Sequence, residues 1–413
     1  MSPLTRVARR RAAALLGAMS AVVATWTVAA PAATADDMRS RQWYLDAMKA
    51  DELWKVATGK GITVAVLDTG VDSTLPELRG KVLPGRNFDT GGLGRVDDKD
   101  RDRHGTNMAL AIAGTGADGG VKGIAPGAGI LPVKTGDYAF NGWKTMFQGI
   151  RYAVDNGARV INISSGGVAD EAEAREWQST VDYAVQKGAL IFAASGNDGR
   201  ERRNVYPASV PGVVAVGAVD TKGKVAKFSD YGSYVDLVAP GIEMPGRCPN
   251  DKNKFCGFWG TSHSAAIASG TAALIWSAHP EWTRNQVLRV MMETAGHTGP
   301  VPSPYIGYGS VRPAQVLLEG KGNPGDPDVD PLLAAQGAGK APTPKPSNAS
   351  QTSPSPENTG ASGNGQAKDN NQAAESDEGG FPLWAIVASA VAVVALIGFG
   401  VVAGVRRRAS TDA

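Results

Sequence analysis

The sequence is poor in cysteine and histidine and has no clear excess of charge of either sign. Of 413 residues, 2 are cysteine and 4 are histidine, which excludes a disulfide-rich scaffold and a cysteine-rich metal site. Lys plus Arg number 42 against 40 Asp plus Glu, so the basic footprint of a nucleic-acid-binding protein is missing. With 42% hydrophobic and 20% charged residues, most of the chain is expected to be globular.

The first apolar run indicates export. Arginines at positions 6 and 9–11 precede the apolar stretch 12–30, and Ala33-Thr34-Ala35 follows it as a small-x-small cleavage site. This order is typical of a secretory signal peptide, predicted here over residues 1–35. A membrane anchor is the alternative, and the Ala-x-Ala end disfavours it.

The second apolar run, 381–405, contains no charged residue and is followed at once by Arg406-Arg407-Arg408. A run of this length spans a bilayer as a helix, and arginines flanking it stay in the cytoplasm. We therefore predict a single transmembrane helix over 381–405 and a cytoplasmic tail over 406–413. The alternative is a buried core helix. The expected localisation is the cell membrane, single-pass, with the large domain extracytoplasmic and the C-terminus cytoplasmic.

Residues 321–380 are rich in Gly, Pro, Ser, Asn and Gln and carry almost no aromatic residues. Such a segment cannot bury enough apolar surface to fold, so a disordered linker is predicted there. The remaining block, 36–320, is the predicted folded domain.

Within that block, strand-like and helix-like segments alternate. Near-continuous apolar stretches that predict strands are 62–67, 159–163, 189–194 and 213–216. Helical stretches between them are predicted over 143–156 and 171–187. Apolar strands alternating with helices indicate an α/β fold, with a mostly parallel central sheet covered by helices on both faces. In such sheets the functional site lies beyond the carboxyl ends of the strands.

Polar residues stand at these junctions. Asp68 ends the first strand, His104 opens an Ala-rich helix, Asn197 follows a strand, and Ser262 precedes the apolar helix 265–277. Each has an ordinary explanation by itself, as a turn residue, a surface histidine, a loop amide or an N-cap. Together they provide Asp, His and Ser in an order known from one group of serine proteases.

The segments around these residues resemble the motifs of the subtilisin-like serine proteases over roughly residues 40–320. The motifs are Val64-Ala65-Val66-Leu67-Asp68-Thr69-Gly70, His104-Gly105-Thr106, Ala194-Ser195-Gly196-Asn197 and Gly260-Thr261-Ser262. The resemblance implies a subtilisin-like fold and an endopeptidase that acts on proteins or peptides.

Site residues follow from this resemblance one by one. Ser262 would be the nucleophile, His104 the general base and acid, and Asp68 the group that orients the imidazole. Asn197 would donate its amide to the oxyanion of the tetrahedral intermediate. Extended substrate would pair with the backbone of a further set of residues: Ser164, Ser165 and Gly166. The other histidines, at 263, 279 and 297, are expected to be structural.

A narrower resemblance is to the mycosins, the membrane-anchored subtilases of type VII secretion. It rests on Gln42-Trp43-Tyr44-Leu45, on Ala50-Asp51-Glu52-Leu53-Trp54 and on the order of signal, protease domain, linker, membrane helix and basic tail. It implies association with a type VII secretion membrane complex. The leading hypothesis is an active endopeptidase; the alternative is a scaffold subunit that stabilises the complex, with weak or dispensable proteolysis.

Two further expectations concern covalent and metal stabilisation. Cys248 and Cys256 lie in the part predicted to be outside the cytoplasm, where pairing is favoured, with two unpaired thiols as the alternative. Glu77 stands where many subtilases have a calcium-binding Asp, but Ala117 replaces the amide residue of the companion loop. No bound calcium, no other metal and no cofactor are therefore predicted.

Overall fold

The computed structural model describes residues 38–89, 93–94, 103–136 and 143–335, all within the first of two compact units, Met1–Pro346 and Ser347–Ala413. The predicted signal peptide, the transmembrane helix, the cytoplasmic tail and the linker beyond residue 335 lie outside these ranges. A search of the described helices finds none long and apolar enough to cross a membrane.

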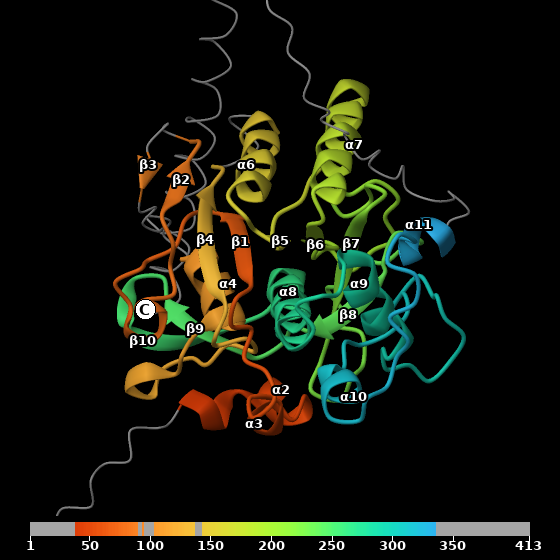
Figure 1. Ribbon diagram of the computed structural model, residues 1–413. Helices are drawn as coiled ribbons and strands as arrows, with labels where there is room; N and C mark the ends of the chain where they lie inside the picture. The colour runs from red at the N-terminus through yellow and green to blue at the C-terminus, as the bar shows by residue number, and fades with distance from the viewer. Residues whose placement is uncertain (1–37, 90–92, 95–102, 137–142, 336–413) are drawn as a thin grey trace, which may run out of the picture. The chain divides into compact units, whose positions relative to one another are not determined.

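An eight-stranded sheet forms the centre of the domain, in the order β3-β2-β4-β1-β5-β6-β7-β8 (Figure 1). All neighbours pair in parallel except β2 and β3, so the predicted mostly parallel sheet is confirmed. The strands are β1 Thr63–Asp68, β2 Gly85–Asn87, β3 Leu93–Gly94, β4 Gly129–Lys134, β5 Val160–Ile163, β6 Leu190–Ala194, β7 Val213–Val219 and β8 Leu237–Pro240. A separate antiparallel hairpin joins β9 Met244–Cys248 to β10 Asp251–Phe258.

Helices surround the sheet. Those that pack on it are α4 His104–Ala113, α6 Lys144–Asp155, α7 Glu171–Gln186 and α8 Thr261–Ala278. The outer α-helices are α2 Trp43–Ala47, α3 Ala50–Leu53, α9 Arg284–Glu293, α10 Pro313–Leu317 and α11 Pro331–Ala335. Short 3-10 helices are η1 Met38–Arg41, η2 Pro76–Leu78 and η3 Ala117–Gly119.

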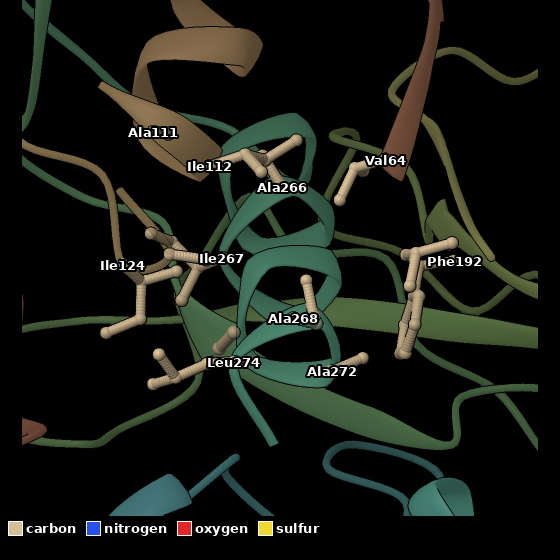
Figure 2. Close-up of a cluster of buried hydrophobic side chains, with 14 of the residues drawn as sticks. Val64, Ala111, Ile112, Ile124, Phe192, Ala266, Ile267, Ala268, Ala272 and Leu274 are labelled. Atoms are coloured by element: carbon tan, nitrogen blue, oxygen red, sulfur yellow. The ribbon is translucent and has the colours of Figure 1, made fainter. Parts of the chain in front are cut away.

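Each central strand supplies side chains to two cores, because successive residues of a strand point to opposite faces. In β1, Val64 and Val66 face the core that contains α4 and α8, whereas Ala65 and Leu67 face the core that contains α6 and α7. Figure 2 shows the first core, with Val64 and other apolar side chains around α8. Both faces of the sheet are therefore covered by helices, as the apolar strands predict.

The folded chain extends past the predicted end of the domain at residue 320. Arg284 of α9 forms a buried ion pair with Asp330, with 2.5 Å between Nη1 and Oδ2. Leu332, in α11, belongs to the core. The polar composition of 321–335 suggested a disordered linker, but one buried charge pair and one apolar anchor hold this segment to the domain.

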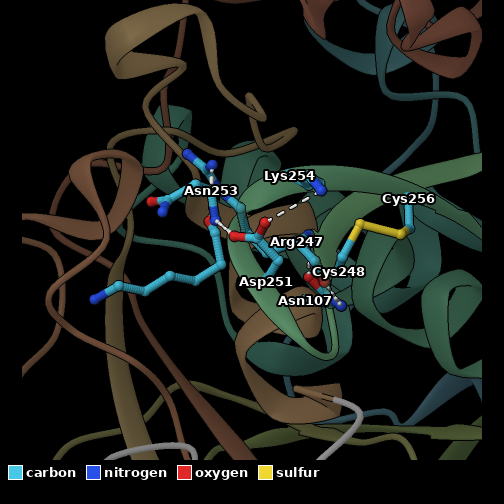
Figure 3. The surroundings of a disulfide bond; sticks show 8 residues. Asn107, Arg247, Cys248, Asp251, Asn253, Lys254 and Cys256 are labelled. Carbon is cyan, nitrogen blue, oxygen red and sulfur yellow. Dashed lines mark hydrogen bonds and ion pairs between the residues drawn. A yellow bond between two sulfur atoms is a disulfide. The ribbon is translucent and has the colours of Figure 1, made fainter.

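The two cysteines pair as expected. A disulfide joins Cys248 and Cys256 across the β9–β10 hairpin (Figure 3). The alternative of two unpaired thiols is thereby excluded. The hairpin ends at Phe258, four residues before Ser262 in the chain.

Candidate active site

Three candidate residues lie at the carboxyl ends of neighbouring strands. Asp68 is the last residue of β1, Ser164 follows β5 directly, and Asn197 follows β6 by three positions. Since β1, β5 and β6 are adjacent and parallel, their ends meet at one edge of the sheet. The structure therefore brings together residues that are up to 129 positions apart in the sequence.

His104 stands at the start of α4 and faces Asp68. Its Nδ1 lies 2.8 and 2.9 Å from the two carboxylate oxygens of Asp68, whose side chain is almost fully buried. A Cβ at Gly105 would come within 2.2 Å of the Gly70 carbonyl, so only glycine permits this close approach of helix and strand. The carboxylate thus fixes the imidazole with Nδ1 inward, which favours the tautomer that leaves Nε2 as a proton acceptor.

Ser262 lies in the first turn of α8, one position after the start of the helix at Thr261. The helix begins four residues before the predicted start at Ala265, and Gly260 takes the N-cap position with φ 145°. The Ser262 hydroxyl donates to the Ser164 carbonyl at 3.0 Å, and the Ser164 hydroxyl donates to the Ser262 carbonyl at 3.0 Å. These reciprocal bonds hold the first turn of α8 against the end of β5.

Asn197 is oriented by Thr261. Its Oδ1 accepts hydrogen bonds from the Thr261 backbone N–H at 2.8 Å and from the Thr261 hydroxyl at 3.0 Å. Because the amide oxygen is engaged in this way, the NH₂ group is the end that can donate to a ligand beside Ser262. Thr261 lies within the Gly-Thr-Ser motif, but no sequence pattern predicted its role in orienting Asn197.

The predicted substrate strand, Ser164–Gly166, is only partly accessible. Ser164 is buried and its hydroxyl also accepts from Asn162 Nδ2 at 2.9 Å, so its side chain supports the site from within. Ser165 is half-buried and Gly166 is exposed. Gly167 next in the chain pairs with Tyr206 by two backbone hydrogen bonds of 2.8 and 2.9 Å. The backbone directly after Gly166 is therefore extended and paired as in a β-sheet.

The remaining histidines lie outside the Asp–His pair. His263 is buried and stacks on Phe258, and burial together with the nearby His104 lowers its pKa to about 3. A ring with so low a pKa is a weak base, so His263 does not compete with His104 for the serine proton. His279 stacks on Trp282 with ring centroids 3.8 Å apart, and the Nδ1 of His297 lies 2.8 Å from a backbone carbonyl.

An exposed aromatic residue that no sequence pattern predicted stands close to Ser262 in the chain. Trp259 lies three positions before Ser262, is 62% exposed, and packs on Phe228 with ring centroids 4.7 Å apart. It presents an apolar surface one residue before Gly260, the N-cap of α8. The only signal in the sequence was a tryptophan directly before Gly-Thr-Ser.

The described ranges contain no group of three or more His, Cys, Asp or Glu side chains placed to hold a metal ion. Glu77, at the position of a calcium ligand in many subtilases, is buried against Arg247 instead.

A parallel α/β sheet with Asp, His and Ser at its carboxyl edge defines a serine endopeptidase of the subtilisin type. The chain belongs to the subtilase family, whose model matches residues 59–322. It is 38% identical over 242 residues to the major intracellular serine protease of Bacillus subtilis, covering 57% of this chain and 74% of that protein. It is 36% identical over 244 residues to thermitase of Thermoactinomyces vulgaris, covering 58% and 83%.

Solved structures of similar fold include two mycosins. MycP1 from Mycobacterium smegmatis matches with a TM-score of 0.61 and 27% identity, over 70% of this chain and 86% of that one. MycP3, a protease from the type VII (ESX-3) secretion system, matches with a TM-score of 0.60 and 28% identity, over 67% and 87%.

Proposed function

We propose that this subtilase is a membrane-anchored, extracytoplasmic endopeptidase whose catalytic triad is Ser262, His104 and Asp68. The observation that carries the proposal is the placement of His104 Nδ1 against both oxygens of a buried Asp68. A buried carboxylate in that position holds the imidazole in the tautomer needed for base catalysis and stabilises the imidazolium that forms.

The reaction divides into two acyl transfers. Ser262 Oγ attacks the scissile carbonyl carbon while His104 Nε2 takes the hydroxyl proton. The C–N bond then breaks, and the leaving amine takes that proton from Nε2. Water attacks the acyl-enzyme as His104 accepts its proton, the acid product departs, and the proton returns to Ser262 Oγ.

Charge on the tetrahedral oxyanion is met by two donors. One is Asn197 Nδ2, which Thr261 orients through Oδ1. The other is the backbone N–H of Ser262 in the first turn of α8, where the helix N-terminus favours negative charge. Substrate backbone pairs with Ser165 and Gly166, at the accessible end of the strand edge.

The proposed cellular setting rests on the two ends of the chain and on the mycosin neighbours. The predicted signal over 1–35 and the predicted membrane helix over 381–405 support a catalytic domain outside the membrane. The likeness to MycP1 and MycP3 supports association with a type VII secretion membrane complex. Neither a cofactor nor calcium is part of the proposal.

A scaffold function is the second candidate, and one contact favours it. The Ser262 hydroxyl lies 3.0 Å from the Ser164 carbonyl, and this contact competes with passage of the hydroxyl proton to His104. A resting site of this kind suits a subunit that stabilises a complex and cleaves slowly.

The test is a double-mutant cycle on peptide hydrolysis by the purified ectodomain. Groups that act as one unit give non-additive losses. Ser262→Ala, His104→Ala and the double variant should therefore lose activity to about the same residual level. Additive losses, or full activity in Ser262→Ala, would mean that the nucleophile is wrongly assigned. A wild-type domain that is folded but inactive on every peptide would favour the scaffold.

A further inference from the structure

One fully buried carboxylate lies outside the active site. Glu77, in η2, is 0% exposed, and its Oε1 accepts from the Val121 backbone N–H at 3.4 Å. Its second oxygen, Oε2, has no hydrogen-bond partner within the described part of the chain. A buried carboxylate without a compensating positive charge is strongly destabilising, so its partner matters.

That partner is Arg247 of β9. Its Nε and Nη2 donate to Glu77 Oε1 at 3.0 and 2.7 Å, and its side chain is only 8% exposed. Nη1 donates to the Lys252 carbonyl at 2.9 Å, and the guanidinium lies over the Phe255 ring, 4.1 Å from its centroid. The guanidinium is thus fixed from several sides and is directed at one carboxylate oxygen.

The backbone of Arg247 is held as firmly as its side chain. Its N–H donates to Asn107 Oδ1 at 2.8 Å, and its carbonyl accepts from Asn107 Nδ2 at 3.2 Å (Figure 3). Asn107 lies one turn after His104 in α4, and the disulfide closes the hairpin from the next residue, Cys248. The hairpin is therefore attached to helix α4 and to the Glu77 region at the same residue.

Calcium does not fit at Glu77. The ion takes six to eight oxygen ligands, but Glu77 Oε1 is already bound by two guanidinium nitrogens and Ala117 offers no side-chain oxygen. A dication beside the guanidinium would also meet a like charge at short range. Glu77, which would have to be a calcium ligand, thus binds the guanidinium of Arg247 instead.

We infer that Arg247 is a built-in substitute for the structural calcium ion of related subtilases, and that the domain keeps its stability without calcium. The positive charge comes from the β9–β10 hairpin itself. The same contact ties this hairpin to the loop around Val121 and to η2. The inference goes beyond the proposed function, and its test reads thermal stability, so either can fail without the other.

The first experiment uses the wild-type domain with intact disulfide, melted in excess EDTA and again in 10 mM calcium chloride, about 10⁴ times a micromolar Kd. The expected shift in Tm between the two is below about 1 °C, because the described residues around Glu77 offer the ion no site and Arg247 already supplies the positive charge there. A drop of several degrees in EDTA that calcium reverses would overturn the inference.

The second experiment breaks the charge pair one side at a time. Arg247→Gln leaves Glu77 unpaired and Glu77→Gln leaves Arg247 unpaired, so each should lower Tm by about 10 °C. The double variant should lose much less Tm than the two single losses added together, because it leaves no buried charge. Additive losses of Tm, or single variants that melt within about 2 °C of wild type, would contradict the role inferred for Arg247.

A matched pair on the surface provides the control. Arg151 and Glu176 lie 3.8 Å apart with 38% and 51% of their side chains exposed. Arg151→Gln should shift Tm by less than about 2 °C, because exposed ion pairs contribute little. If Arg247→Gln does not fold, Arg247→Lys replaces it: lysine keeps the charge but loses the fork, and a Tm equal to wild type would show that the guanidinium contacts are not needed.

Discussion

The two faces of the sheet are covered by helices of different kinds. On one face, every residue of α8 from Thr261 to Trp276 is buried, and in α4 every residue from Gly105 to Ala113 is buried. On the other face, α7 buries only Trp177, Thr180, Val181 and Ala184, and the rest of its surface faces outward. His104 and Ser262, the two residues that exchange a proton in the proposed reaction, lie in the first turns of the two buried helices.

This difference indicates how the site is held. A helix that is packed on all sides cannot shift without disturbing the core. The side chains at its first turn are therefore held in place by that core. An amphipathic helix such as α7 covers the sheet but holds no candidate catalytic residue. Substitutions should therefore have large effects on the α4–α8 face and small effects on the α6–α7 face.

The largest effect is expected for Ser262→Ala, compared with Ser179→Ala on the exposed side of α7. Removing the nucleophile should reduce kcat at least 10³-fold, whereas removing the outer hydroxyl should change kcat less than about twofold. Both variants delete one oxygen and should melt within about 2 °C of wild type. Peptide hydrolysis and thermal melts measure the two quantities. Equal kcat in the two variants would contradict the expected difference between the α4–α8 face and the α6–α7 face.

Asn197→Ala should lower kcat by about 10²–10³-fold with little change in KM, because the oxyanion forms only in the transition state. The backbone donor at Ser262 remains, so the loss is smaller than for the nucleophile. Asn156→Ala, at the end of α6, removes an exposed amide and should leave kcat unchanged. A rise in KM with unchanged kcat for Asn197→Ala would instead indicate a role in substrate binding.

Gly270→Leu tests the packing of α8. A Cβ at Gly270 would lie 2.4 Å from Ile124 Cγ2 and 3.5 Å from the Ile112 Cα, so a larger side chain must displace the α4 side of the core. The free energy of unfolding should fall by about 3 kcal/mol or more. Ala172→Leu on the exposed face of α7 should change it by less than about 0.5 kcal/mol. Denaturant unfolding of both variants gives the two values, and similar values would argue against a rigid α8.

The smallest effect concerns pH. Burial raises the pKa of Asp236 to about 8, although its Oδ2 accepts from the Ala215 backbone N–H at 2.9 Å. An unfolded aspartate titrates near pH 4, so the folded state holds an extra proton between about pH 4 and 8. Stability from this group is complete below that window and is lost as pH rises through the folded pKa.

Asp236→Asn keeps an acceptor oxygen and removes the titration. Its Tm should exceed that of wild type by about 3–5 °C at pH 9 and should approach it at pH 5. Asp182→Asn, on the exposed side of α7, should follow wild type at both values. A wild-type Tm that rises relative to Asp236→Asn between pH 5 and 9 would reverse the sign and contradict this assignment.

The central sheet and the Asp–His pair were predictable because they depend on local patterns. Apolar strands predict parallel pairing, and Asp68 and His104 stand at element ends that the topology brings to one edge. The start of α8 was misplaced because the helix is apolar on all sides, so its polar first turn looked like a cap preceding the helix. Periodicity gives no boundary for such a helix.

Contacts between distant segments were not predictable in the same way. Arg247 and Glu77 are separated by 170 positions, and no periodic pattern links them. The buried pair of Arg284 and Asp330 likewise extended the domain beyond residue 320, where composition alone suggested a linker. Trp259 and Thr261 adjoin the predicted nucleophile but lack a charge or a nucleophilic role that would single them out.

The most direct test of the central claim is labelling of the folded protease domain with a fluorophosphonate, which reacts only with a serine activated by an adjacent base. The adduct is located by peptide mass spectrometry. The account predicts a single labelled residue, Ser262, with labelling lost in Ser262→Ala and in His104→Ala but retained in Ser179→Ala. A folded wild-type domain that takes up no label, or one labelled at another serine, would contradict it.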